Sequence, residues 1–149
     1  MATITFGGLD EYHKELEQIL RHVPKLINAS LYDGAGVLAE AVQNEIVGLT
    51  ELSTVQRQGL HDGLGIAHFW NEKGATVTKI GFVGYNQKQT KRWPKGQPNA
   101  MIARSLIRGT SWMRANRFTN RAAKKAREKC IGVMQTRFDV ELKRITDTY

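Results

Sequence analysis

The sequence predicts one α+β domain spanning residues 1–149, in which a small antiparallel β-sheet packs against N-terminal helices and a long C-terminal helix. Apolar residues recur at helical spacing over residues 10–47 and again from about residue 117 onward. Between these regions, apolar and polar residues alternate on both sides of a turn, as in a β-hairpin. A chain of 149 residues with 41% hydrophobic and 24% charged residues can bury one modest core, and it shows no linker, repeat or low-complexity tract.

The N-terminal region predicts two helices. Asp10 can cap the first, after a hinge at Gly7-Gly8, and Pro24 either ends that helix or begins the second in its first turn. The second helix runs to about Val47. Its Asp33-Gly-Ala-Gly36 patch lowers helix propensity, which close packing against another element would explain. The apolar positions of the two helices are Tyr12, Leu16, Ile19, Leu20 and Val23, then Ile27, Leu31, Leu38, Val42 and Ile46.

The middle of the chain predicts a loop followed by a hairpin. Residues 48–63 are polar and are expected to form a loop. Residues 64–70 and 76–83 are rich in β-branched and aromatic side chains and flank a turn at residues 71–74, which is typical of two paired strands. Gly81 and Gly84 mark a bulge or a strand end.

The C-terminal half predicts a loop over residues 85–99, a short helix and a long one. Asn99 is placed to cap a helix over residues 101–107 that Gly109 ends in a left-handed conformation, and a strand is the alternative for so short a run. The long helix starts near Arg117. Cys130, the single cysteine, lies among its apolar positions and is expected to be a buried small hydrophobe.

The formal net charge of +8 is unevenly distributed. Residues 1–60 hold eight acidic and four basic side chains, whereas residues 73–129 hold fifteen lysines and arginines and one acid, Glu128. Such asymmetry is typical of a basic region that contacts an acidic partner or nucleic acid. A solvated basic face is the other interpretation, and composition does not separate the two.

The basic loop at residues 88–96 places four cations around Trp93. These residues suit phosphate contacts with a stacking ring, or an arm that presses the tryptophan into a neighbouring subunit. No standard nucleic-acid module is recognisable, so we favour the protein contact over DNA contact and over a solvated loop.

Catalytic motifs are absent from the sequence: it has no nucleophile elbow, Walker loop or His-Glu-x-x-His. His61, Asp62 and His68 are the nearest approach to a metal or general-base site, but a fully extended strand would separate the two imidazoles by roughly 23 Å. A turn at His61 and a half-buried His68 are expected instead. The scarcity of acids in the basic region disfavours a nuclease. The acids of the first helix are expected to form a solvated face or an interface with a basic neighbour: Asp10, Glu11, Glu15 and Glu17.

The sequence has no apolar stretch long enough to cross a bilayer and no signal-peptide pattern at residues 1–8, so synthesis in the cytoplasm is expected. We expect no enzymatic activity, cofactor or metal.

The order of these features resembles the small neck or tail-component proteins of tailed phages, a family of head–tail joining and tail-completion proteins. Short motifs along nearly the whole chain carry the resemblance. They are Gly8-Leu9-Asp10 before the helices, Gly59-Leu60 or Gly63-Leu64 before a strand, Ile80-Gly-Phe-Val-Gly84 at the end of the hairpin, Ala103 leading to Gly109-Thr110, and Phe118 opening the last helix. Ile107-Arg108 stand where the family has an acidic–aromatic pair, and Arg117 where it has proline.

The resemblance implies a non-enzymatic structural protein of the virion, assembled in the host cytoplasm as a ring of copies between portal and tail. Its partners would be other copies of itself and further neck, portal or tail proteins. We expect the contacts on Lys91, Arg92, Trp93, Arg104, Arg108, Thr110, Trp112, Arg114, Arg117 and Phe118. The alternative function is DNA binding by the basic region, residues 88–129, with contacts from Lys88, Lys95, Arg121, Lys124 and Lys125.

Overall fold

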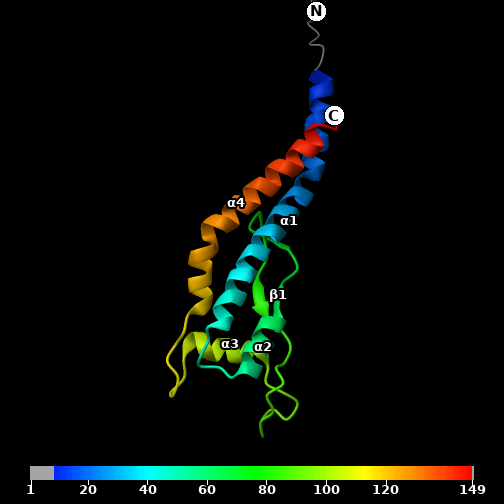
Figure 1. Cartoon of the computed structure of the whole chain (residues 1–149). Helices are drawn as coiled ribbons and strands as arrows, with labels where there is room; N and C mark the ends of the chain where they lie inside the picture. The colour runs from blue at the N-terminus through cyan, green and yellow to red at the C-terminus, as the bar shows by residue number, and fades with distance from the viewer. Residues whose placement is uncertain (1–8, 149) are drawn as a thin grey trace, which may run out of the picture.

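The computed structural model describes residues 9–148 and confirms the predicted α+β class (Figure 1). Two long helices lie side by side. Two short helices gather toward one end of the pair, and two small antiparallel ladders run from that end back toward the middle of the pair. The predicted hinge at Gly7-Gly8 lies outside the described residues. The elements in chain order are α1 (Leu9–Val47), α2 (Thr54–Gly63), β1 (Leu64–Ile66), β2 (Trp70–Glu72), β3 (Ala75–Val77), β4 (Ile80–Phe82), α3 (Asn99–Arg108) and α4 (Phe118–Thr146).

α1 is one continuous helix of 39 residues, so the prediction of two helices divided at Pro24 was wrong. Proline inside a helix removes one hydrogen bond and crowds the preceding turn. Here Pro24 is exposed, which leaves the freed carbonyl group on the water side of the helix. Two residues later Leu26 is 2% exposed, so burial of apolar side chains resumes at once and stabilises the helix beyond the proline.

α1 and α4 pack in an antiparallel pair, the shaft of the molecule (Figure 1). A Cβ atom on Gly34 would lie 2.5 Å from Cγ of Met134, which confirms that this glycine allows close packing. The thiol of Cys130 donates a hydrogen bond to the Gly34 carbonyl at 3.2 Å. Cys130 is half-buried rather than fully buried, and this burial raises the pKa of its thiol.

The main core lies where the far end of α1 meets α2, α3 and the start of α4, a region that we call the base. Its buried side chains are Val42, Ile46, Leu49, Leu52, Leu60, Ile102, Ala103, Leu106, Phe118 and Ala122. The predicted long loop over residues 48–63 was wrong, because residues 54–63 form α2. The signal was a capping box: the Ser53 hydroxyl accepts from the Gln56 backbone N–H, and the Gln56 side chain accepts from the Ser53 N–H.

The predicted hairpin is present but is divided into two ladders. β2 pairs with β3 around the two-residue turn Lys73-Gly74, whose φ angles of 51° and 82° suit the tight turn of a twisted hairpin. β1 pairs with β4 further along the same two segments, in the register Leu64↔Phe82. Hydrogen bonds between Ala67 and residues 78–79 bridge the interruption.

Asn99 does not cap α3 as predicted. Pro98 holds the capping position, and the Asn99 side chain donates instead to the Val83 carbonyl at 2.9 Å. Gly109 does end the helix, with φ of 79°. α4 then opens at Phe118, which is 0% exposed and packs against Phe82 at 6.1 Å between ring centroids.

Candidate functional site

One end of the molecule exposes a cluster that we call the arginine end. Arg104 and Arg108 lie on α3, and Arg114 and Arg117 on the loop that follows it; all four side chains are exposed. Trp112 at the tip of that loop is 88% exposed. The structure therefore brings five of the predicted contact residues to one end of the fold, at the opposite end from the start of α1 (Figure 1).

The loop that carries Trp112 is held in shape by its own hydrogen bonds. The Thr110 N–H donates to the Met113 carbonyl at 2.8 Å, and the Met113 N–H donates to the Thr110 hydroxyl at 3.1 Å. The Asn116 N–H donates to the Leu106 carbonyl at 2.8 Å. Thr110 thus shapes the turn that carries Trp112. Phe118 was wrongly included among the contact residues, because its side chain is buried in the core and exposes no surface.

The basic loop after the hairpin is more ordered than an arm would be. Trp93 is half-buried, and its N–H lies 3.1 Å from both the carbonyl and the hydroxyl oxygen of Thr90. The Arg92 guanidinium lies 5.8 Å from the Trp93 ring centroid, within range of a cation–π contact. Lys88, Lys91 and Lys95 are exposed around this turn.

Two of the cations predicted for DNA contact are engaged within the chain. Glu45 of α1 receives Lys125 Nζ at 2.6 Å and Arg121 Nε at 3.3 Å. These hydrogen bonds, that of Lys125 foremost, hold the pKa of the Glu45 carboxyl below its ordinary value. Arg137 similarly lies 3.6 Å from Asp33. Part of the complementarity between the acidic and basic regions is therefore satisfied inside one copy, while Lys124 remains exposed.

The start of α1 forms an exposed surface that the sequence did not predict, the α1 tip. Tyr12, Leu16 and Leu20 are 60%, 41% and 67% exposed, and their spacing of four puts them on one helix face. The first turns of α1 extend past the end of α4, so no other described helix packs beside them (Figure 1). The acids of the tip are also exposed: Asp10, Glu11, Glu15 and Glu17.

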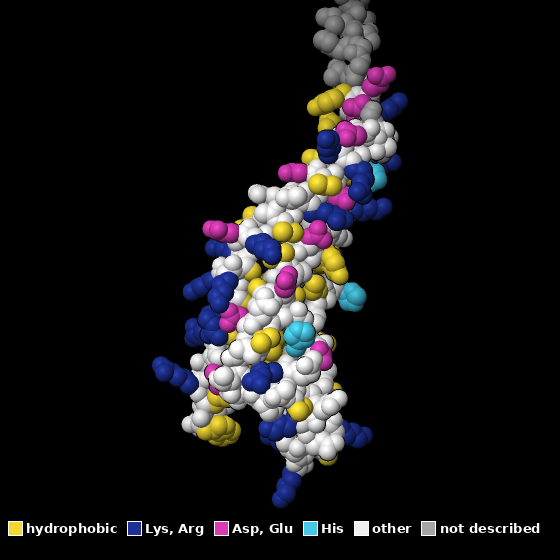
Figure 2. Space-filling view, in the orientation of Figure 1, with side chains coloured by type: hydrophobic (Ala, Val, Ile, Leu, Met, Phe, Trp, Pro, Cys, Tyr) yellow, Lys and Arg dark blue, Asp and Glu magenta, His cyan; other side chains and the backbone are white. Residues whose placement is uncertain are grey.

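The space-filling view shows how charge is distributed over one face (Figure 2). Several acidic side chains lie near the α1 tip, with lysine and arginine side chains among and just below them, and further lysine and arginine side chains project from the lowest part of the molecule. The α1 tip thus carries more acidic than basic side chains, the arginine end is cationic, and each end carries exposed apolar side chains.

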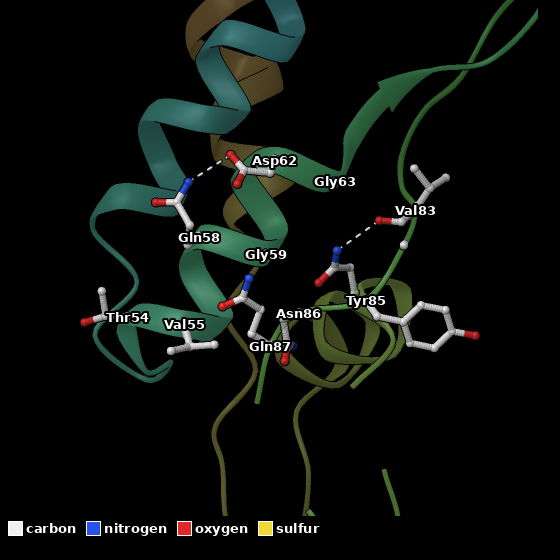
Figure 3. Close-up of a pocket in the computed structure, with 12 residues that line it drawn as sticks. Thr54, Val55, Gln58, Gly59, Asp62, Gly63, Val83, Tyr85, Asn86 and Gln87 are labelled. Carbon is white, nitrogen blue, oxygen red and sulfur yellow. Dashed lines mark hydrogen bonds between the residues drawn. The ribbon is translucent and has the colours of Figure 1, made fainter. Parts of the chain in front are cut away.

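A groove of about 550 Å³ lies in the base, between α2 and the segment at residues 83–87 (Figure 3). Thr54, Val55 and Gln58 line the α2 side, and Val83 and Tyr85 lie across from them. Val55, Val83 and Tyr85 are 43%, 67% and 67% exposed. Sequence reasoning missed this groove, because it depends on the unpredicted helix α2.

Two buried asparagines support the groove. The Asn99 side-chain amide lies close to Gly59 and Gly63. A Cβ atom added at Gly59 would lie 2.7 Å from Asn99 Oδ1, and one added at Gly63 would lie 2.5 Å from Asn99 Nδ2. Asn86 is 3% and Asn99 2% exposed, and each has one side-chain atom without a hydrogen-bond partner, Nδ2 of Asn86 and Oδ1 of Asn99. Such unpaired buried groups are costly, so these two atoms are candidates for contact with a bound group.

His61 and Asp62 lie on α2 rather than at a strand start, and His61 Nδ1 is 3.3 Å from Asp62 Oδ1. Hydrogen bonds from Gln58 and His61 lower the pKa of the Asp62 carboxyl. His68 lies between β1 and β2 and is exposed, not half-buried as predicted. Within residues 9–148, no group of three His, Cys, Asp or Glu side chains is placed to hold a metal ion.

Comparison with models of protein families, with characterised proteins and with solved structures finds no match for this chain. Among the helices that the structure describes, none is long and apolar enough to cross a membrane.

Proposed function

We propose that this chain is a structural virion protein of a tailed phage, a neck or tail-completion component that assembles as a ring of copies at the head–tail joint. One observation carries the proposal: the α1 tip is acidic and apolar, and the opposite arginine end is cationic and carries an exposed tryptophan. Surfaces that differ at the two ends suit head-to-tail contact between copies. Such contacts close into a ring when the rotation between neighbours permits.

The two kinds of side chain at these ends would contribute differently. Opposite charges steer association and set its register more than they supply affinity. Trp112 and the Tyr12–Leu16–Leu20 face supply apolar surface, and tryptophan and arginine are frequent anchors of interfaces. The motif resemblance to neck proteins supports the same class and gives the proposed partners: copies of itself and further neck, portal or tail proteins.

Sedimentation of the purified chain at about 50 mM and at physiological salt tests the proposal, because surface charge pairing weakens with salt. We expect oligomers that Trp112→Ala and Leu16→Ala both weaken. Val140→Ala, which truncates an exposed valine on α4, serves as the matched control. A chain that stays monomeric and binds neither portal nor tail proteins at both salt concentrations would refute the proposal.

DNA binding is the second candidate, since Lys88, Lys95 and Lys124 are exposed and form no ion pair among the described residues. It predicts a duplex-DNA complex whose affinity falls steeply with salt, by a slope of about 0.9 per phosphate contacted. Because Arg121 and Lys125 bind Glu45, Lys88→Ala and Lys95→Ala should weaken DNA binding more than Arg121→Ala. The absence of a complex at about 50 mM salt would exclude this function.

A further inference from the structure

We infer that the groove between α2 and residues 83–87 binds residues 2–6 of a second copy of this chain. The inference rests on the head-to-tail contact proposed above and names the segment that completes it. The groove offers apolar walls at Val55, Val83 and Tyr85 and a volume of about 550 Å³, within the range of sites that enclose a ligand.

The sequence before α1 has the pattern of a strand that fits such walls. Residues 2–6 read Ala-Thr-Ile-Thr-Phe, so apolar and β-branched polar residues alternate. In an extended segment, alternate side chains point to the same face. Ile4 and Phe6 would therefore enter the groove together, and Thr3 and Thr5 would face away from it.

The unpaired atoms of the buried asparagines suit a peptide backbone. Asn86 Nδ2 is a donor without an acceptor, and Asn99 Oδ1 is an acceptor with a free site. An extended segment presents both a carbonyl and an N–H group, which match this pair. Both atoms are covered in the free chain, so the segment reaches them only when the side chains that cover them move aside.

The length of α1 decides which copy supplies the segment. A helix of 39 residues is about 58 Å long, at 1.5 Å per residue. The groove lies in the base, near the far end of α1, whereas residues 1–8 directly precede the beginning of α1 in the sequence. Eight extended residues span at most about 29 Å. A chain therefore cannot fill its own groove, and the occupant comes from a neighbour.

Mixing two cysteine variants tests this exchange. One preparation carries Ile4→Cys and the other Val83→Cys, both in a Cys130→Ser background and with tags of different size. Under mild oxidation we expect a disulfide-linked heterodimer. The control pair of Ile4→Cys with His68→Cys, an exposed position away from the groove, should give at least about tenfold less.

Binding of a labelled peptide with the sequence of residues 1–8 to the full chain gives a second measurement. Val83→Glu should weaken binding at least about tenfold, and Val140→Glu, the same change at an exposed valine on α4, should leave it unchanged. No peptide binding, or a heterodimer yield equal to the control pair, would overturn the inference. If the chain forms oligomers but the Ile4→Cys and Val83→Cys variants do not cross-link, the inference about the groove is wrong and the proposed neck function still stands. A cross-link in a chain that binds neither portal nor tail proteins would support the inference and count against the neck function.

Discussion

The base and the α1 tip place leucines in opposite environments. In the base, Leu60 and Leu106 are 0% exposed and lie in one core with Phe118. At the tip, Leu16 and Leu20 are 41% and 67% exposed on one helix face. The comparison indicates that burial in the base stabilises the fold, whereas the tip leaves apolar surface exposed, as the proposed contact between copies requires.

Truncating one leucine in each region tests this comparison most directly. Leu106→Ala should lower the free energy of unfolding by about 2–5 kcal/mol, because it leaves a cavity in a packed core. Leu20→Ala should change it by less than about 0.5 kcal/mol and should weaken self-association. Urea unfolding and sedimentation measure the two effects. Equal losses in the free energy of unfolding would show that the tip contributes to the stability of the fold.

The proline between the tip and the buried part of α1 gives the next largest effect. Pro24→Ala restores a helical hydrogen bond at an exposed position and should stabilise the chain by about 1–3 kcal/mol. Thermal unfolding followed by circular dichroism measures the change. A lower melting temperature would mean that the packing of α1 requires the proline, and Lys25→Ala is the neighbouring exposed control.

The capping box of α2 contributes to the base on a smaller scale. Ser53→Ala removes the acceptor for the Gln56 N–H and should cost about 1 kcal/mol of stability. Thr54→Ala, at the next exposed position, should cost less. Chemical unfolding of both variants checks the order, and an equal cost would argue against the cap.

The smallest effect comes from the ion pairs that join α1 to α4. Because the pKa of Glu45 is lowered in the folded chain, its contribution is present above its ordinary pKa and is lost as the pH falls through the lowered value. Glu45→Gln should cost at most about 1 kcal/mol near neutral pH, since both cations are largely exposed. The difference from the unmodified chain should shrink as the pH falls below the ordinary pKa of a glutamate, and a difference that grows there would contradict this assignment.

Much of the fold could be predicted from periodicity and turn chemistry. The α+β class, the hairpin, the stop at Gly109 and the helix from Phe118 all follow from local patterns. The continuity of α1 could not be predicted in this way. The helix continues past Pro24 because its apolar side chains are buried against α4, which lies about a hundred residues later in the chain. Helix α2 was missed although Ser53 and Gln56 have the spacing of a capping box.

The candidate surfaces were harder to predict, because exposure depends on how elements end relative to one another. Trp112 and its neighbouring arginines were identified, since charge and loop signals are local. Phe118 has the same aromatic character and is entirely buried. The α1 tip is exposed only because α1 extends beyond α4, and no pattern within residues 9–20 encodes that overhang.

The pairing of α1 with α4 also has a consequence for how the chain acquires its structure. Gly34 meets Cys130 and Glu45 meets Lys125, contacts that join segments 96 and 80 residues apart. A mostly helical protein usually folds quickly because its contacts are local, and here the long helices find each other only after the intervening chain is made. On the ribosome, α1 would therefore emerge with its apolar stripe uncovered until residues 118–146 follow, an interval in which a chaperone or a neighbouring nascent chain can bind it.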